Sequence, residues 1–127
     1  MNEHHDKSLE LADSSSTPIQ ERLAGWGNVN ARPATLLPVF NTANLTRIVS
    51  NSNQVGGAIA RGLGRSYGDS AVNYEGSVLS LISRNRMLRF DSNAGLLTCE
   101  AGVSLAEIIQ CLLPRGWFLP TTPGTKF

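Results

Sequence analysis

The sequence predicts a mixed α/β domain built from short strands and two helices. Its 127 residues suit one domain of modest size, and its hydrophobic fraction of 41% is enough for a core. The apolar runs are only a few residues long, well short of the roughly 20 that cross a bilayer. Some read as strands and others have helical periodicity. We therefore expect no transmembrane segment and a fold that combines sheet with helix.

The charge and the cysteine content exclude several classes of protein. The formal net charge is +1, which provides no electrostatic case for binding nucleic acid. Two cysteines cannot build a disulfide-dense secreted scaffold. Met1–Glu10 is polar and has no apolar signal segment. We therefore expect a cytoplasmic protein.

The first 20 residues are expected to form a polar tail. They offer too little apolar area to offset the entropy that ordering would cost. We predict disorder to about Ser16, with at most a turn of helix at Lys7–Ala12. His4 and His5 are adjacent, but further ligands at suitable spacing are missing, so no metal site is predicted. The folded body is expected to span residues 21–127.

Short apolar segments predict the strands. Thr35–Phe40 contains Pro38, which indicates an edge strand or the start of one. The Ser92–Gly95 turn should join the strands on either side of it as a hairpin. Trp26, in a glycine-flanked turn, is expected to anchor the core. The remaining predicted strands are Gly57–Ala60, which should be buried, and Val78–Ile82, Met87–Asp91, Leu96–Ala101 and Trp117–Leu119.

Hydrophobic periodicity predicts two helices. The first spans Asn41–Ser52, is capped by its first or second residue, and carries Leu45, Ile48 and Val49 on one face. The second spans Leu105–Leu113 and follows a capping box formed by Ser104 and Glu107. That capping role argues against a general-base role for Glu107.

The other reactive or charged side chains have structural interpretations. Cys99 and Cys111 form no C-x-x-C motif and are expected to pack in the core. The three arginines near the predicted hairpin are expected to form a solvated strand edge: Arg84, Arg86 and Arg89.

One glycine-rich segment is the candidate site. Five of the 12 glycines lie between Gly56 and Gly68, directly around a predicted strand. Glycine permits positive φ and close backbone approach, and successive backbone N–H groups can converge on an anion. Arg61 and Arg65 would add positive charge near a diphosphate, and Ser66 a hydroxyl donor. The segment predicts a diphosphate site, with a tightly packed β-turn as the alternative.

This segment matches neither of the two common phosphate-binding motifs. A Rossmann fingerprint needs G-x-G-x-x-G opening a helix, whereas here the spacing is G-x-G-x-x-x-G and Ala71–Gly76 has no helical stripe. A Walker A loop needs Gly-Lys-Ser/Thr, which this sequence does not contain. A non-catalytic nucleotide- or anion-binding module therefore stays open beside an enzyme.

The run Arg61–Asp69, R-G-L-G-R-S-Y-G-D, resembles the pyrophosphate loop of a family of FAD-linked oxidases. This family has the p-cresol methylhydroxylase (PCMH), or vanillyl-alcohol oxidase (VAO), type of FAD-binding domain. The likeness is greatest to its sugar and aldonolactone oxidases, among them decaprenylphosphoryl-β-D-ribose 2-oxidase. Other blocks agree in order and spacing across Arg22–Phe127: Gly25-Trp26-Gly27, Glu100-Ala101-Gly102-Val103, and the P-x-G…P…P-G-T segment from Pro114 to Thr125.

The resemblance implies an α+β fold, the first of two subdomains that hold FAD between them, with a small mixed sheet and flanking helices. It implies an FAD-dependent oxidoreductase acting on CH–OH groups of sugar-type or lactone substrates. Backbone amides of Gly62–Tyr67 would hold the diphosphate, and Asp69 would order the loop, because two anions repel. The implied FAD-binding residues are Ala60, Arg61, Gly62, Leu63, Gly64, Arg65, Ser66, Tyr67, Gly68, Asp69, Ser70 and Gly124.

The chain departs from the family pattern at its end. The family continues past P-G-T with a V-G-G-A-type strand and a histidine-containing segment, and in some members that histidine bonds to the flavin. The sequence ends at Phe127, and His4 and His5 are its only histidines. No catalytic residue is therefore assigned. We expect an N-terminal piece of a longer oxidase that supplies the diphosphate cradle and does not turn over alone.

Overall fold

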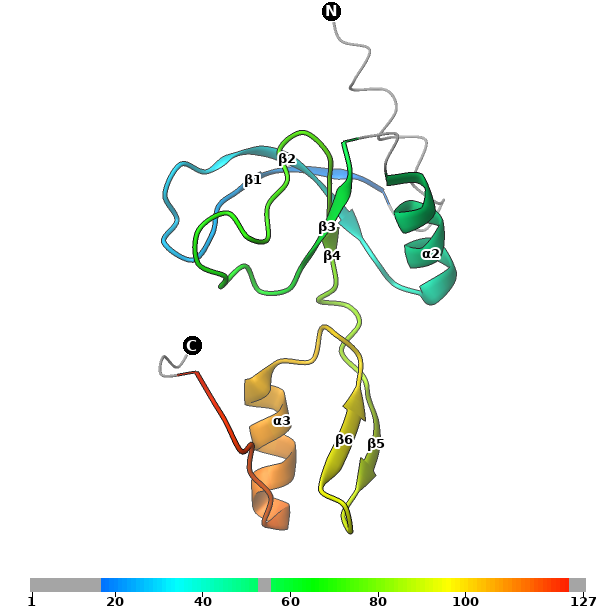
Figure 1. The fold of residues 1–127 in the computed structure, drawn as a ribbon, viewed down its shortest axis with the longest axis vertical. Helices are drawn as coiled ribbons and strands as arrows, with labels where there is room; N and C mark the ends of the chain where they lie inside the picture. The colour runs from blue at the N-terminus through cyan, green and yellow to red at the C-terminus, as the bar shows by residue number, and fades with distance from the viewer. Residues whose placement is uncertain (1–16, 53–55, 124–127) are drawn as a thin grey trace, which may run out of the picture. The chain divides into compact units, whose positions relative to one another are not determined.

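The computed structural model describes residues 17–52 and 56–123, which fall into two compact units. Unit 1 ends at Arg84 and unit 2 begins at Asn85. Together they contain a four-stranded sheet, a two-stranded sheet and two α-helices, which confirms the predicted α+β class (Figure 1). No helix in these residues has the length and hydropathy to cross a membrane. The tail predicted to Ser16, with His4 and His5, lies outside the described residues.

Unit 1 is built on a mixed sheet with the strand order β1-β2-β4-β3. β1 is antiparallel to β2, whereas β4 runs parallel to both β2 and β3. The central pair β2–β4 therefore has a partner on each side. The strands are β1 (Ile19–Leu23), β2 (Arg32–Pro38), β3 (Ala58–Arg61) and β4 (Ser77–Ser80).

The sheet of unit 1 carries apolar clusters on both faces, because successive side chains of a strand point to opposite sides. Val78 and Leu79, neighbours on β4, belong to different clusters. The first cluster is completed by Leu23, Ala34 and Val72. The second is completed by Leu37, Val39 and Ile48, the last of these from helix α2 (Thr42–Asn51). Helix α2 and the segment around Val72 thus provide the two layers that cover the sheet.

β2 is an interior strand, so the expectation of an edge strand is wrong. β1 pairs with Arg32–Leu36 and β4 with Thr35–Pro38. Pro33 and Pro38 therefore lie where β2 has a single partner, and a missing N–H disrupts the sheet less there. β3 is the outer strand instead, and it is mostly half-buried where a buried strand was expected.

Two other expectations for strands and core are wrong, and one strand was not predicted. The sequence pattern does not predict β1, because four of its five residues are exposed and show no apolar alternation; β1 includes the last two residues of the predicted tail. Trp26 is 45% exposed and packs edge-on against Tyr67, so it is no core anchor. Trp117–Leu119 is not a strand, because it pairs with no strand among the described residues.

Helix α2 begins as the sequence predicts. The Asn41 side chain caps it by accepting the Asn44 N–H at 2.8 Å. Ile48 is fully buried and Leu45 packs against the same cluster. Val49 is 53% exposed, so the predicted apolar face is correct for two of its three residues.

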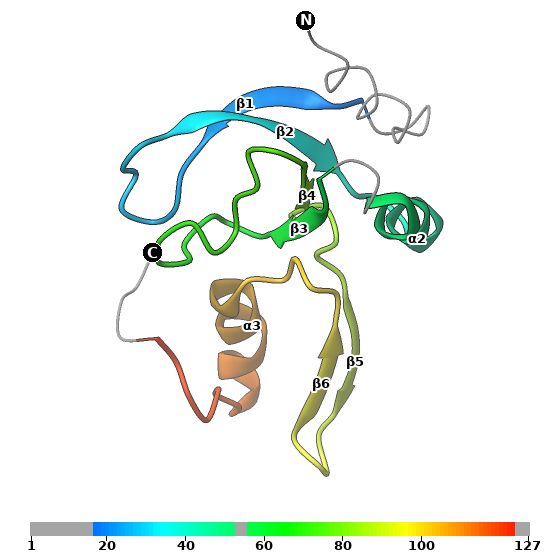
Figure 2. The same cartoon turned by 45° about the horizontal axis from the view of Figure 1, so that its top comes forward.

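Unit 2 joins a hairpin to a helix, and both match their predictions. β5 (Met87–Asp91) pairs antiparallel with β6 (Leu96–Cys99) across the predicted turn. α3 (Leu105–Leu112) lies alongside them within the unit (Figure 2). It starts with the predicted capping box and continues into a short 3₁₀ turn, η3 (Leu113–Arg115). Cys99 and Cys111 are both half-buried free thiols.

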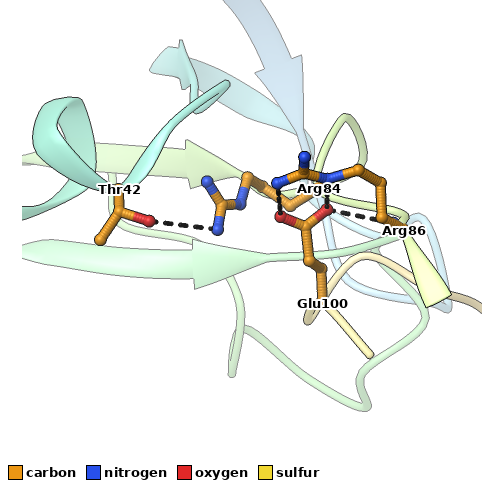
Figure 3. Close-up of polar contacts among 4 residues, drawn as sticks. All are labelled: Thr42, Arg84, Arg86 and Glu100. Atoms are coloured by element: carbon orange, nitrogen blue, oxygen red, sulfur yellow. Dashed lines mark hydrogen bonds and ion pairs between the residues drawn. The ribbon is translucent and has the colours of Figure 1, made fainter. Parts of the chain in front are cut away.

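A charged pair closes the open end of this hairpin (Figure 3). The Glu100 carboxylate is almost buried and accepts the Arg86 backbone N–H at 3.0 Å. It also accepts Nε at 3.1 Å and Nη2 at 2.9 Å from the Arg86 guanidinium, whose pKa these hydrogen bonds raise. The Arg86 side chain is still 72% exposed, so the predicted solvated edge is correct for Arg86, although the sequence does not predict its Glu100 partner. Arg84, in unit 1, donates to the Thr42 hydroxyl at 3.3 Å.

Ile48→Ala should destabilise unit 1 by about 2–5 kcal/mol, because it opens a cavity beneath a fully buried side chain. Val49→Ala is the matched control on the same helix and should change stability by less than about 0.5 kcal/mol. Urea unfolding measures both. Equal losses would contradict the assigned buried face of α2.

Glu107→Gln should lower the melting temperature of unit 2 at pH 7 but not near pH 3. Hydrogen bonds from the Ser104 hydroxyl and backbone N–H hold the pKa of Glu107 below its usual value. The resulting stability is present above the unfolded pKa of about 4.3 and is lost as pH falls through the lower folded value. Thermal unfolding from pH 3 to 7 measures the difference, with the exposed Glu75→Gln as control. A difference that does not vary with pH would refute the charged capping box.

Candidate functional site

The candidate site is the connection of residues 62–76 between β3 and β4. Parallel neighbours cannot be joined by a tight turn, so the chain must travel back along the sheet. Here it does so without a helix, as the absence of a helical stripe predicts. Gly62–Ser70, called the cradle loop below, is exposed except for the half-buried Gly64. Ala60 and Arg61, the two other predicted site residues in this region, end β3.

The second half of the connection anchors the cradle loop to the core. Ala71 and Val72 are buried. The Tyr74 hydroxyl donates to the Leu23 carbonyl at 3.2 Å, and Asn73 Nδ2 donates to the Gly56 carbonyl at 3.0 Å. The exposed half of the connection is thus held by a return segment that is part of the folded sheet.

The β1–β2 connection packs against the cradle loop, backbone on backbone. A Cβ on Gly25 would stand 1.8 Å from the Gly68 carbonyl oxygen, so glycine is required there. The Trp26 N–H donates to the Ser66 carbonyl at 3.0 Å. The Trp26 and Tyr67 rings meet edge to face with their centroids 5.9 Å apart. The two connections accordingly lie side by side in both views of the fold (Figures 1 and 2).

Arg61 lies inside this arrangement. Its Nη2 donates to the Ala24 carbonyl at 2.9 Å and its Nη1 to the Ala71 carbonyl at 3.2 Å. Gly64 has φ +70°, and a Cβ there would stand 2.3 Å from Nη2. From the sequence, Arg61 is predicted to place a positive charge beside a diphosphate. The sequence contains no signal that its guanidinium bonds these two carbonyl groups instead.

The cradle loop directs several of its carbonyl groups to protein donors. The carbonyls of Ser66, Tyr67 and Asp69 accept, in order, from Trp26 N–H, Ser70 Oγ and Val72 N–H. The N–H groups of Gly62, Gly64 and Gly68 donate to no residue in the described part of the chain. Gly64 and Gly68 have positive φ, and a Cβ on Gly62 would meet nothing within 4 Å. Glycine N–H groups without a protein acceptor, on a loop that is anchored through other groups, suit an anion.

The remaining predicted site residues divide into three cases. Asp69 takes part in loop order through its carbonyl, while its side chain is exposed. Leu63 and Arg65 are exposed on the cradle loop. Gly124 lies outside the described residues. Residues 17–52 and 56–123 hold no His, Cys, Asp and Glu group that could bind a metal ion.

Comparison with known proteins identifies relatives among flavin enzymes. The profile of the FAD binding domain family matches residues 39–127. The chain is 40% identical over 108 residues to decaprenylphosphoryl-beta-D-ribose oxidase of Mycolicibacterium smegmatis, covering 84% of this chain and 24% of that protein. It is 28% identical over 123 residues to a probable mitochondrial D-2-hydroxyglutarate dehydrogenase of Oryza sativa subsp. indica, covering 91% and 22%. For the Danio rerio D-2-hydroxyglutarate dehydrogenase the values are 27% over 119 residues, covering 92% and 21%.

The chain spans at most about a quarter of the length of these relatives. The family match covers more than half of this chain and includes the entire cradle loop. Gly62 and Gly68 of that loop leave room for close backbone approach, as a bound diphosphate requires. The chain belongs to the FAD binding domain family, as its resemblance to the PCMH-type flavin oxidases predicts, and its cofactor is FAD.

Proposed function

We propose that the cradle loop binds the diphosphate of FAD in an FAD-dependent oxidoreductase. The backbone N–H groups of Gly62–Tyr67 would hold the phosphate oxygens. The observation that carries the proposal is that the Gly62 and Gly64 N–H groups have no acceptor among the described residues, on a loop anchored within unit 1 through its Ser66, Tyr67 and Asp69 carbonyls. Convergent N–H groups are a recurrent way to bind phosphate.

The FAD-binding unit is proposed to begin near residue 21, before the start of the family match. Ala24 and Gly25 both contact the loop or its supporting arginine. β2 is also an interior strand of the same sheet. Removing these residues would leave the cradle loop without the β1–β2 connection that packs against it. This supports the predicted domain of residues 21–127.

The proposed reaction is oxidation of a CH–OH group in a sugar-type or lactone substrate. One relative is named as an oxidase of decaprenylphosphoryl-β-D-ribose and another as a dehydrogenase of D-2-hydroxyglutarate. Both of these named compounds carry a hydroxylated carbon. FAD, when bound, supplies the hydride acceptor, while the protein binds and orients it. The residues described here provide the cradle, and we assign none of them a catalytic role. We propose that these 127 residues do not turn over alone.

Gly62→Val should reduce FAD affinity at least about tenfold, because a branched side chain would fill the open space over the loop backbone. The test is a fluorescence titration of FAD into the apoprotein of the full-length gene product that contains this chain. Gly27→Ala is the matched control, since its Cβ would meet only a Val29 methyl at 3.8 Å. Unchanged flavin loading of Gly62→Val would refute the cradle.

Arg65→Gln should weaken FAD binding and flatten its salt dependence. Arg65 is exposed on the loop, and a cation beside a diphosphate contributes an attraction that salt screens. Titrations at about 0.05 and 0.5 M salt measure the effect, with Arg115→Gln in unit 2 as the control for net charge. Equal salt slopes for the Arg65 variant and the unmodified protein would exclude Arg65 from the site.

A further inference from the structure

We propose that Arg61 is a positioning residue, whose guanidinium holds the cradle loop in its FAD-binding conformation without touching the phosphates. This inference rests on the proposed function of that loop. It assigns Arg61 a different role from Arg65, although both arginines belong to the same glycine-rich run. The geometry of the Arg61 side chain carries it.

The sheet holds the base of this side chain. Arg61 is the last residue of β3 and stands opposite Ser80 of β4. Its carbonyl accepts the Leu81 N–H at 3.0 Å. The side chain therefore starts from a point fixed by strand pairing, and the residue is only partly exposed to solvent.

The guanidinium joins two segments that are distant in sequence. Ala24 lies 37 positions before Arg61, on the β1–β2 connection, and Ala71 lies 10 positions after it, where the cradle loop ends. Both alanines are buried, so a carbonyl deprived of its donor there would lose a hydrogen bond away from water. One side chain thus links the β1–β2 connection to the end of the cradle loop.

Gly64 closes the loop over this guanidinium. With φ +70° and no side chain, it allows the backbone to pass where a Cβ would lie 2.3 Å from Nη2 and 2.7 Å from Cζ. Arg61 therefore occupies the interior of the turn that presents the Gly62 and Gly64 N–H groups. Loss of the guanidinium would remove the support beneath those donors.

Lysine at this position separates positioning from charge. A guanidinium presents its donors in a rigid planar fork and can bond two carbonyls at once, whereas an ammonium is a compact point charge on a flexible stem. Arg61→Lys keeps the positive charge and loses the fork. A purely electrostatic role predicts that lysine restores FAD affinity, and a positioning role predicts that it does not.

The experiment uses Arg61→Lys and Arg61→Met in the full-length gene product. Hydrogen exchange is measured in the apoprotein for peptides covering Trp26 and Val72, whose N–H groups donate to the Ser66 and Asp69 carbonyls of the loop, and FAD affinity is measured by fluorescence titration. Both variants should exchange these amides at least about tenfold faster and bind FAD at least about tenfold more weakly. The proposal would be overturned if Arg61→Lys kept the exchange rates and the FAD affinity of the unmodified protein. Fast exchange together with full FAD affinity would also overturn it.

A double variant keeps the test valid if single variants lose general stability. Gly64→Ala strains the turn and also presses on the guanidinium, and only the second effect disappears when Arg61 is already lysine. The changes in the exchange of these amides from Gly64→Ala and Arg61→Lys should therefore be less than additive. Full additivity would overturn the contact. The Gly62→Val variant tests the proposed function separately, because full FAD binding by that variant would show that the loop is not the FAD site.

Discussion

The close approach of residues 24–26 to residues 66–68 is the contact on which the site depends. Gly25 lies so near the Gly68 carbonyl that any side chain would collide with it. The Trp26 N–H then satisfies the Ser66 carbonyl, and the Arg61 guanidinium satisfies Ala24. Because these are main-chain contacts, they position the loop backbone directly. A phosphate-binding loop that works through its own N–H groups needs that kind of support.

The sheet topology explains why such a loop can exist here. β3 and β4 are parallel neighbours, so the chain must cross back between them. A helix would satisfy its own backbone, whereas an irregular crossover must find partners elsewhere. Tyr74 and Val72 secure the return half on the core. The outward half directs carbonyls to protein donors and leaves glycine N–H groups for a ligand.

Features controlled by neighbouring residues were predictable. The Asn41 cap, the Ser104–Glu107 capping box and the hairpin turn after Asp91 all rest on side chains a few positions apart. Features controlled by distant partners were not. The interior place of β2 depends on β1, which has no apolar pattern, and the Arg86–Glu100 pair joins residues 14 positions apart.

The flavin-binding family, the position of the glycine-rich loop and most of the local elements can be derived from the sequence alone. These follow from motif residues and short-range periodicity, which are written consecutively along the chain. Three features became clear from the folded chain: Arg61 points inward to two carbonyls, Trp26 is partly exposed, and Gly25 is a contact glycine. Each of them depends on backbone atoms that strand pairing brings together across tens of residues, and no local pattern encodes that proximity.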